Sequence, residues 1–218
     1  MATTQPPETK RKRAPSQRSL ATKDRVLDAA EKVFAAHGFD GATIRDIAAE
    51  AGEPIGTIHH HGGGKTALFH QTVARRAEAL SHARLDALGR SKTQAALTLE
   101  TVLAAFMRPI FTLADQDPRW RYYARLVAFV SADTRWQDIS ATCFDPTAAV
   151  FIEEIRALLP HASRPQVAEG FVFSVSAMLA LMTSATRIAA LGDGVSPRET
   201  QINHLVRFCA AGFDSSPR

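Results

Sequence analysis

The chain has 218 residues, 45% of them hydrophobic and 22% charged, and a formal net charge of +4. This composition provides enough apolar surface for a sizeable buried core and excludes a chain that is disordered throughout. Two cysteines without CxxC spacing, Cys143 and Cys209, argue against a disulfide framework and favour a reduced, cytoplasmic protein.

Positive charge is concentrated at the start of the chain. The first 25 residues contain seven Lys and Arg residues and two acidic residues, a charge of +5, so the other residues together carry −1. Residues 1–21 also contain three prolines and show no periodicity, which predicts a disordered basic arm without a signal peptide. Two interpretations of this arm stay open: a solvated tail, and a segment that binds a polyanion.

A first helix is predicted directly after the arm. Thr22 is a suitable N-cap for a helix from Lys23 to His37, and Gly38 is a suitable end for it. Apolar residues spaced three and four apart give this helix one inward face, formed by Val26, Ala30, Val33 and Phe34.

The stretch from Thr43 to Phe69 predicts two short helices joined by a tight turn, followed by the start of a third helix. The first short helix has an apolar face and a capping pair, Thr43 with Asp46, and it ends at Gly52. Pro54 suits the first position of the second helix, because its missing N–H would have no helical partner there. Short polar side chains remain on the free face of that second helix. This arrangement is typical of a helix-turn-helix that binds DNA.

The same residues carry a resemblance to a known family. The chain is similar to the N-terminal domain of TetR-family transcriptional regulators, with spacing kept, over residues 24–39 and 43–48 and at Gly56-Thr57-Ile58, His61, Lys65 and Leu68-Phe69. The resemblance implies a DNA-binding domain followed by a larger helical domain that binds a small effector and forms a homodimer.

Helical patterns continue to the end of the chain, and no stretch alternates long enough to predict a strand. Proline, glycine and capping signals predict breaks at 89–92 and 192–194. They divide this part into helices from Lys65 to Leu88, Thr93 to Ala114, Asp117 to Ser131, Thr134 to Cys143, Ala148 to Leu159, Ser163 to Leu191 and Ser196 to Ala211. The uncharged stretch from Gly170 to Thr186 is short for a membrane span, so a buried or interface helix is favoured.

We therefore predict an all-α protein with four parts: a disordered basic arm (1–21), a helix-turn-helix DNA-binding domain (22–66), a helical ligand-binding and dimerisation domain (67–213) and a tail (214–218). The resemblance implies a dimer formed through the last two long helices, where small residues permit close approach. The expected interface residues are Ala177, Leu181, Ser184, Ile188 and Leu205.

The predicted DNA-binding residues belong to the two short helices and the start of the third. They are Thr43, Arg45, Pro54, Ile55, Gly56, Thr57, His59, His60, His61 and Lys65. Hydroxyl and imidazole groups meet phosphates and base edges, and free N–H groups at a helix start attract a phosphate.

Three positions depart from the family pattern. Glu53 stands where a small apolar residue is usual, His59 where tyrosine is common, and Gly62 where an aromatic residue usually follows His61. The missing aromatic ring is expected to weaken the attachment of the second short helix to the core.

Other chemistry is not indicated by these residues. The adjacent histidines 59–61 diverge by about 100° each on a helix and do not converge on one metal ion. The segment from Gly62 to Thr66 lacks the first glycine and the preceding strand of a phosphate-binding P-loop. No residue set has the spacing of an activated nucleophile, so neither a cofactor nor an enzyme activity is predicted.

Aromatic and Met residues are abundant in the predicted larger domain. Most are expected to fill an ordinary core, but the resemblance implies a cavity, and an apolar or acyl ligand suits such a lining. The candidate lining residues are Phe106, Phe111, Trp120, Tyr123, Phe129, Trp136, Phe144, Phe173 and Met178. Arg121 and Arg125, one helical turn apart, are either solvated or partners for a ligand anion, and the first interpretation is favoured.

The sequence thus predicts a cytoplasmic, homodimeric transcriptional regulator, a repressor that a small apolar ligand releases from a palindromic double-stranded DNA operator. The alternative is an all-helical enzyme or ligand-binding protein that retains the helix-turn-helix only as a scaffold.

Overall fold

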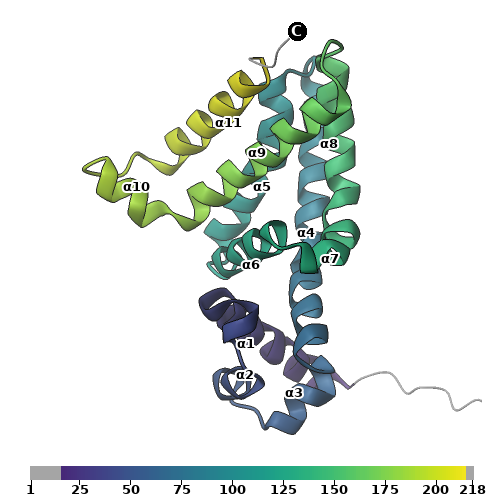
Figure 1. Ribbon diagram of the computed structural model, residues 1–218, viewed down its shortest axis with the longest axis vertical. Helices are drawn as coiled ribbons and strands as arrows, with labels where there is room; N and C mark the ends of the chain where they lie inside the picture. Colours follow the sequence, from purple (N-terminus) through teal and green to yellow (C-terminus); the bar gives the residue numbers. More distant parts are fainter. Residues whose placement is uncertain (1–15, 215–218) are drawn as a thin grey trace, which may run out of the picture.

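The computed structural model describes residues 16–214, and every regular element among them is a helix (Figure 1). The N-terminal unit, at the bottom of the view, consists of α1 (Gln17–Gly41), α2 (Ile44–Ala51) and α3 (Ile55–Gly62). The long α4 (Lys65–Gln94) rises from it into the C-terminal unit. That unit contains α5 (Leu99–Gln116), α6 (Trp120–Ala132), the 3₁₀ turn η1 (Thr134–Trp136), α7 (Gln137–Cys143), α8 (Asp145–Leu158), α9 (Arg164–Thr183), α10 (Ala185–Leu191) and α11 (Arg198–Asp214). The prediction of an all-α fold is confirmed.

Helix α1 begins earlier than predicted. Its N-cap is Ser16, whose hydroxyl accepts a hydrogen bond from the N–H of Ser19 at 3.3 Å. No Gly or Pro lies between Ser16 and Lys23, and extending a formed helix is far easier than nucleating one. The predicted start at Lys23 is therefore wrong, and residues 16–21 are helix rather than arm. Residues 1–15 and 215–218, where the rest of the arm and almost all of the predicted tail fall, lie outside the described residues.

Gly89 does not end α4, although a break was predicted there. One glycine inside a helix costs about 1 kcal/mol, and the neighbouring Leu88 is buried and holds α4 in place. The helix runs to Gln94, so the predicted start of the next helix at Thr93 is also wrong. Helix α5 begins after Thr98, which forms a reciprocal capping box with Thr101.

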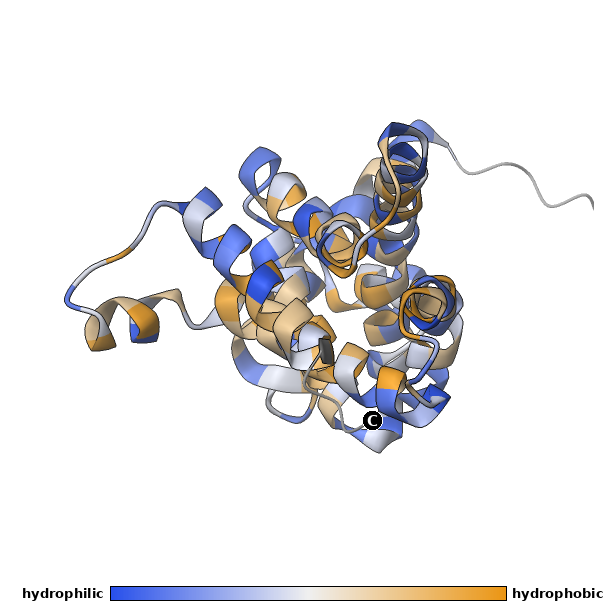
Figure 2. Cartoon of the chain, turned by 90° about the horizontal axis from the view of Figure 1, so that it is seen from above, coloured by the Kyte–Doolittle hydropathy of each residue, from blue (hydrophilic) through white to orange (hydrophobic). Residues whose placement is uncertain are grey.

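The predicted helix from Ser163 to Leu191 is two helices. Ser163 caps α9 as expected, but the backbone leaves helical geometry at Ser184 (φ −113°, ψ 21°) and α10 follows. None of the residues of α10 is buried in the single chain, so no packing keeps it in line with α9. Figures 1 and 2 both show α10 standing away from the other helices.

Helix α9 is long and apolar enough to cross a membrane by length and composition alone. Only 28% of its most apolar window is buried inside the chain. A helix of this kind is weak evidence for a membrane span, because core and interface helices pass the same test.

The core has one centre in each unit, joined through α4. Phe34, Ile47 and Ile58 are fully buried in the N-terminal unit, and Phe34 meets Phe69 of α4 edge to face with ring centroids 5.0 Å apart. In the C-terminal unit the largest fully buried side chain is that of Tyr123. Helix α4 therefore belongs to both cores and connects them.

Candidate nucleic-acid interface

The start and end of α2 are fixed by local hydrogen bonds. The Thr43 hydroxyl accepts the N–H of Asp46 at 3.1 Å, and the Asp46 carboxylate accepts the N–H of Thr43 at 3.0 Å. This reciprocal capping box confirms the predicted pair. Gly52 ends α2 in the left-handed conformation (φ 63°), which glycine adopts without strain. Pro54 is the N-cap of α3 rather than its first residue.

Helix α3 has one buried face and one free face. Ile58 is fully buried and holds the helix on the core of the N-terminal unit. On the other side Ile55, Gly56, His59 and His60 are exposed. Helices α2 and α3 lie at the end of the molecule remote from α8 and α11 (Figure 1), so this face is open to a large partner.

Glu53, in the turn between α2 and α3, is tied to α1. Its carboxylate accepts a hydrogen bond from Arg25 Nη2 at 2.5 Å, and its side chain is only 17% exposed. The salt bridge neutralises a charge that would otherwise repel a polyanion. The sequence pattern gave no signal for this pairing, because Arg25 is far from Glu53 in sequence.

His61 and Gly62 face inward at the end of α3. Partial burial, together with the neighbouring His60 and Lys23 charges, lowers the pKa of His61 below its usual value. Gly62 is buried, and a Cβ atom there would lie 3.1 Å from both Cβ and Cδ1 of Leu68. Leu68 thus occupies the space next to Gly62. The expectation that a missing aromatic ring weakens the attachment of α3 therefore has no basis in this packing.

Lys65, at the start of α4, is engaged within the protein. Its Nζ donates to the Asp40 carbonyl at 3.2 Å and lies 4.6 Å from the centroid of the Phe39 ring. Among the described residues of the N-terminal unit, the exposed cations without an ion-pair partner are Arg18, Lys23 and Arg45. Sequence analysis included Arg45 and missed Lys23, which lies near His61 in space.

No group of three potential metal ligands occurs among residues 16–214. The rings of His60 and His61 are 4.9 Å apart at an interplanar angle of 75°. The histidine triplet is thus spread around α3, as adjacent helical positions require.

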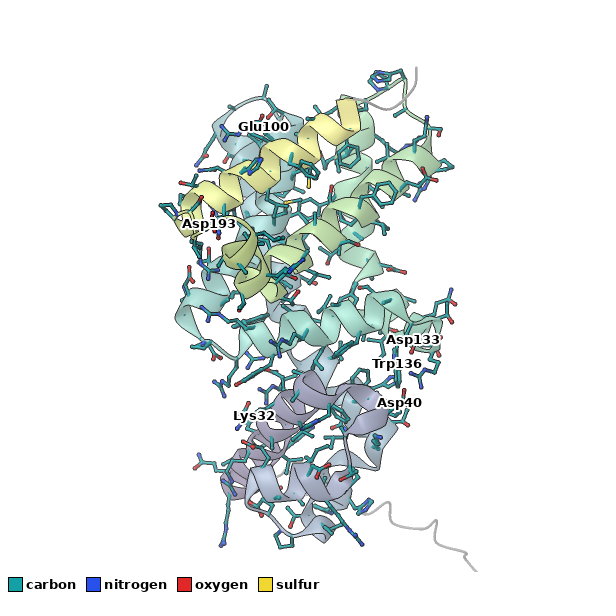
Figure 3. The ribbon with its side chains drawn as sticks, turned by 60° about the vertical axis from the view of Figure 1, so that its left-hand side comes forward. Lys32, Asp40, Glu100, Asp133, Trp136 and Asp193 are labelled. Carbon is teal, nitrogen blue, oxygen red and sulfur yellow. The ribbon has the colours of Figure 1, made fainter. Side chains whose placement is uncertain are left out.

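One junction between the two units is formed by η1 and the end of α1. Asp133 and Trp136 lie next to Asp40 of α1 (Figure 3). Arg135 makes two hydrogen bonds to the carboxylate of Asp40, at 3.0 and 2.9 Å, and also binds Asp133. Trp136 packs on Phe39 with ring centroids 4.7 Å apart. Trp136 therefore belongs to this junction, and its predicted place in an interior ligand pocket is wrong.

A second junction connects α1, α4 and the loop before α6. The buried Glu31 carboxylate accepts a hydrogen bond from Arg76 Nε at 2.6 Å, and Arg76 Nη1 lies 3.4 Å from Asp117. On the same side Asp28 binds Arg75 and accepts a hydrogen bond from Arg119 at 2.7 Å. Charges of both units are thus paired through α4.

The other predicted pocket residues divide into two groups. Phe106, Phe111, Trp120, Tyr123 and Met178 are buried in the C-terminal unit, and Phe144 is half-buried. Phe129 and Phe173 are 42% and 70% exposed, so the prediction that they line an interior cavity is wrong. Their helices, α6 and α9, turn these positions outward, which the abundance of aromatic residues alone does not reveal.

The five predicted dimer residues share one surface feature. Together they line a groove of about 510 Å³ between α9, α10 and α11. Large apolar side chains are exposed on and around these helices, namely Val172, Phe173, Ile188, Leu191, Val195 and Phe208.

This fold, a helix-turn-helix unit with a free α3 face joined by a long helix to a larger helical unit, defines the class of helix-turn-helix regulators. The family model "Bacterial regulatory proteins, tetR family" matches residues 26–72, and "Tetracyclin repressor-like, C-terminal domain" matches residues 104–212, half of the chain. The chain belongs to the TetR family of bacterial regulatory proteins. This is a family of regulators rather than enzymes, and nothing supports the alternative of an enzyme that uses the helix-turn-helix as a scaffold.

Curated relatives match mainly in the N-terminal part. The chain is 35% identical over 72 residues to the HTH-type transcriptional repressor AcnR of Corynebacterium efficiens, covering 31% of this chain and 38% of that protein. It is 38% identical over 64 residues to AcnR of Corynebacterium glutamicum, covering 28% and 34%. The match thus spans little more than a third of these relatives.

Solved structures resemble most of the chain. A tetR family transcription regulator from Shewanella sp. PV-4 aligns with a TM-score of 0.62 at 21% identity, covering 88% of this chain and 95% of that one. A TetR-like transcriptional regulator from Rhodococcus sp. RHA1 aligns with a TM-score of 0.61 at 16% identity, covering 94% and 100%. At these identities the likeness concerns the fold alone.

Proposed function

We propose that this protein is a dimeric, DNA-binding transcriptional repressor, released from its operator by a small molecule bound in the C-terminal unit. The observation that carries the proposal is the free face of α3, where His59 and His60 are exposed opposite the buried Ile58. A helix of this size fits the major groove of B-DNA, where base edges are distinguishable.

In the proposed complex the residues of α2 and α3 have different roles. His59, His60 and Thr57 contact base edges or nearby phosphates, and Arg45 contacts the backbone. The N–H groups at the start of α3, around Ile55 and Gly56, point toward a phosphate. Lys65 positions α1 against α4 through Asp40 and Phe39, as its contacts indicate.

The partner across the two-fold axis is a second copy of the same chain. The groove between α9 and α11 and the exposed apolar residues around it support this assignment, since a monomer in water gains nothing from exposing them. Viewed from above, α10 carries strongly hydrophobic positions and stands away from the other helices (Figure 2). Two α3 helices then meet successive major grooves about 34–36 Å apart.

Regulation follows from the placement of α4. It carries Arg75 and Arg76, which bind the N-terminal unit, and its upper half lies in the C-terminal core. A ligand that prefers one position of α4 in that core changes the separation of the two α3 helices, within the limit of its differential affinity for the two states. We place this activity in the cytoplasm.

Fluorescence anisotropy with the DNA upstream of the protein's own gene tests the proposal. The full-length protein should prefer this DNA to a scrambled duplex by about 10³ or more. Replacing both His59 and His60 by Ala should reduce the preference by about tenfold or more for each base edge that is no longer bound. His82→Ala, an exposed histidine of α4, is the matched control and should change nothing. Equal affinity for both duplexes would overturn the proposal.

A further inference from the structure

Arg84 of α4 is a buried cation without a counterion. The residue is 7% exposed, and no carboxylate among residues 16–214 forms an ion pair with it. Isolated charges are strongly disfavoured away from water, and buried guanidinium groups are normally paired. Burial lowers the pKa of Arg84 to about 9, which still leaves the side chain charged at neutral pH.

The contacts that Arg84 does make use little of its hydrogen-bonding capacity. Its Nε donates to the Phe106 carbonyl at 2.9 Å, and its guanidinium carbon lies 3.7 Å from the centroid of the Phe106 ring. Its Nη2 faces the thioether of Met178 at 3.8 Å, and a thioether is a weak acceptor. A guanidinium carries five N–H donors in a planar fork that matches a carboxylate.

A purely structural role accounts for only one of these donors. Pro109 inside α5 has no N–H to donate to the carbonyl of Ala105, four residues before it, and Phe106 is the next residue in that turn. Arg84 Nε supplies a donor there. The outer nitrogens of the fork have no such explanation.

Tyr123 of α6 presents an unsatisfied polar group in the same region. Its side chain is fully buried, and its hydroxyl has no hydrogen-bond partner among the described residues. Burial raises the pKa of Tyr123, so the hydroxyl keeps its proton and remains a donor. Arg84 and Tyr123 lie close enough to influence each other's ionisation.

We propose that the small-molecule effector carries a carboxylate, which binds between α4, α5, α6 and α9 with Arg84 as its counterion and the Tyr123 hydroxyl as a second donor. The inference rests on the proposed function and names the chemical class of its ligand, an acid with an apolar body. The buried Tyr123 hydroxyl lacks an acceptor, and the buried Arg84 lacks a carboxylate partner, which is the arrangement expected of a site whose acceptor is an anionic ligand.

Met178 makes entry of such a ligand feasible. Its unbranched side chain has three rotatable bonds and adapts its shape readily. When the Met178 side chain rotates away from Arg84, a carboxylate oxygen of the ligand takes the place of the thioether sulfur next to Nη2. The surrounding Phe106 and Trp120 rings are buried and provide apolar contacts for the rest of the ligand. Arg84 lies on α4, the same helix from which Arg75 and Arg76 bind the N-terminal unit. Binding of the ligand carboxylate to Arg84 therefore acts directly on α4.

Thermal melts of the full-length protein with a panel of acids, each paired with its carboxamide, test the proposal. The panel comprises hexanoate, decanoate, phenylacetate, phenylpropionate and salicylate. At least one acid should raise the melting temperature by several degrees while its amide does not. Arg84→Met should abolish this difference, and Arg84→Lys should keep part of it. Tyr123→Phe should weaken binding of the acid by about tenfold, because one hydrogen bond to a charged group is removed.

Arg108→Met, which removes a half-buried arginine of α5 that pairs with Glu199, is the control and should retain the preference for acids. Without ligand, Arg84→Met should melt higher than the wild type, since an unpaired buried charge is gone. A lower melting temperature, an acid preference that survives Arg84→Met, or no preference with any pair overturns the inference. Operator binding of the same ligand-free preparations is measured in parallel. Its loss would refute the proposed function, whereas intact operator binding without acid preference refutes only the ligand class.

Discussion

Arg76 Nε and Glu31 Oε2 lie 2.6 Å apart across the junction between α4 and α1, and both side chains are almost completely buried. The pairing is incomplete, because Glu31 Oε1 and Arg76 Nη2 have no hydrogen-bond partner among the described residues. Arg76 also reaches toward Asp117 of the C-terminal unit at 3.4 Å. The contact between the two units thus depends on charges removed from water.

Glu31 should make the stability of the protein depend on pH. Burial raises its pKa above the usual 4.5, and the attraction of Arg76 opposes this only in part. The protonated Glu31 carboxyl therefore contributes to the free energy of unfolding. This contribution is fully present below pH 4.5 and is lost as pH rises through the folded-state pKa. The free energy of unfolding of the wild type minus that of Glu31→Gln should fall across this range, by about 1.4 kcal/mol for each pH unit that separates the folded-state pKa from the usual value.

Urea melts of both proteins at pH 4.5, 5.5 and 6.5 measure this difference. Glutamine does not titrate, so all other groups cancel in the comparison. A difference that grows with pH would mean that the attraction of Arg76 exceeds the cost of burial.

Gly62 and Gly56 form a matched pair on α3 for testing the packing of this helix. A Cβ atom at Gly62 would lie 3.1 Å from two atoms of the buried Leu68, whereas nothing lies within 4 Å of a Cβ at Gly56. Gly62→Phe should destabilise the protein by about 1–3 kcal/mol through overpacking. Gly56→Ala should stabilise it by about 0.5–1 kcal/mol through helix propensity. Urea melts decide, and a gain in midpoint for Gly62→Phe would show that Leu68 can move aside.

Sequence analysis was most accurate where one local signal decides the structure. The capping box of Thr43 with Asp46 and the left-handed Gly52 needed no knowledge of distant residues. The structure at Gly89 and at Ser184 was predicted wrongly because packing determines it. Burial of Leu88 stabilises α4 across Gly89, whereas none of the residues of α10, which follows Ser184, is buried.

The parts of the site that sequence analysis missed all depend on long-range contacts. Arg25 with Glu53 and Arg135 with Asp40 are pairs far apart in the chain. The exposure of Phe129 likewise depends on which face of α6 is covered. No periodicity within one helix identifies its partner.

Phe208 should be essential for the dimer. It is 67% exposed on α11 and lines the groove with Leu181 and Leu205, so the proposed second copy would cover it. Phe208→Glu places a charge in that interface and should yield monomers at micromolar concentration, as measured by light scattering. Phe129→Glu, at another exposed aromatic position outside the groove, is the control and should remain dimeric. An intact Phe208→Glu dimer would place the interface elsewhere.

Arg45 should contribute to DNA affinity without contributing to sequence preference. It is exposed on α2 and has no ion-pair partner among the described residues, as expected of a side chain that binds a phosphate. Removing one contact to a phosphate flattens the plot of log affinity against log salt concentration by about 0.9, and the substitution removes two such contacts from a dimer. Arg45→Ala should therefore weaken binding at low salt and reduce the slope, while the ratio of operator to scrambled-DNA affinity stays nearly constant.

Anisotropy titrations at several salt concentrations measure both quantities for Arg45→Ala. Arg90→Ala removes another exposed arginine, near the far end of α4, and controls for net charge. If both variants lower the slope equally, the effect reflects the overall field of the protein rather than a contact. If the operator preference of Arg45→Ala falls together with its affinity, Arg45 contacts base edges, because only those contacts distinguish one sequence from another.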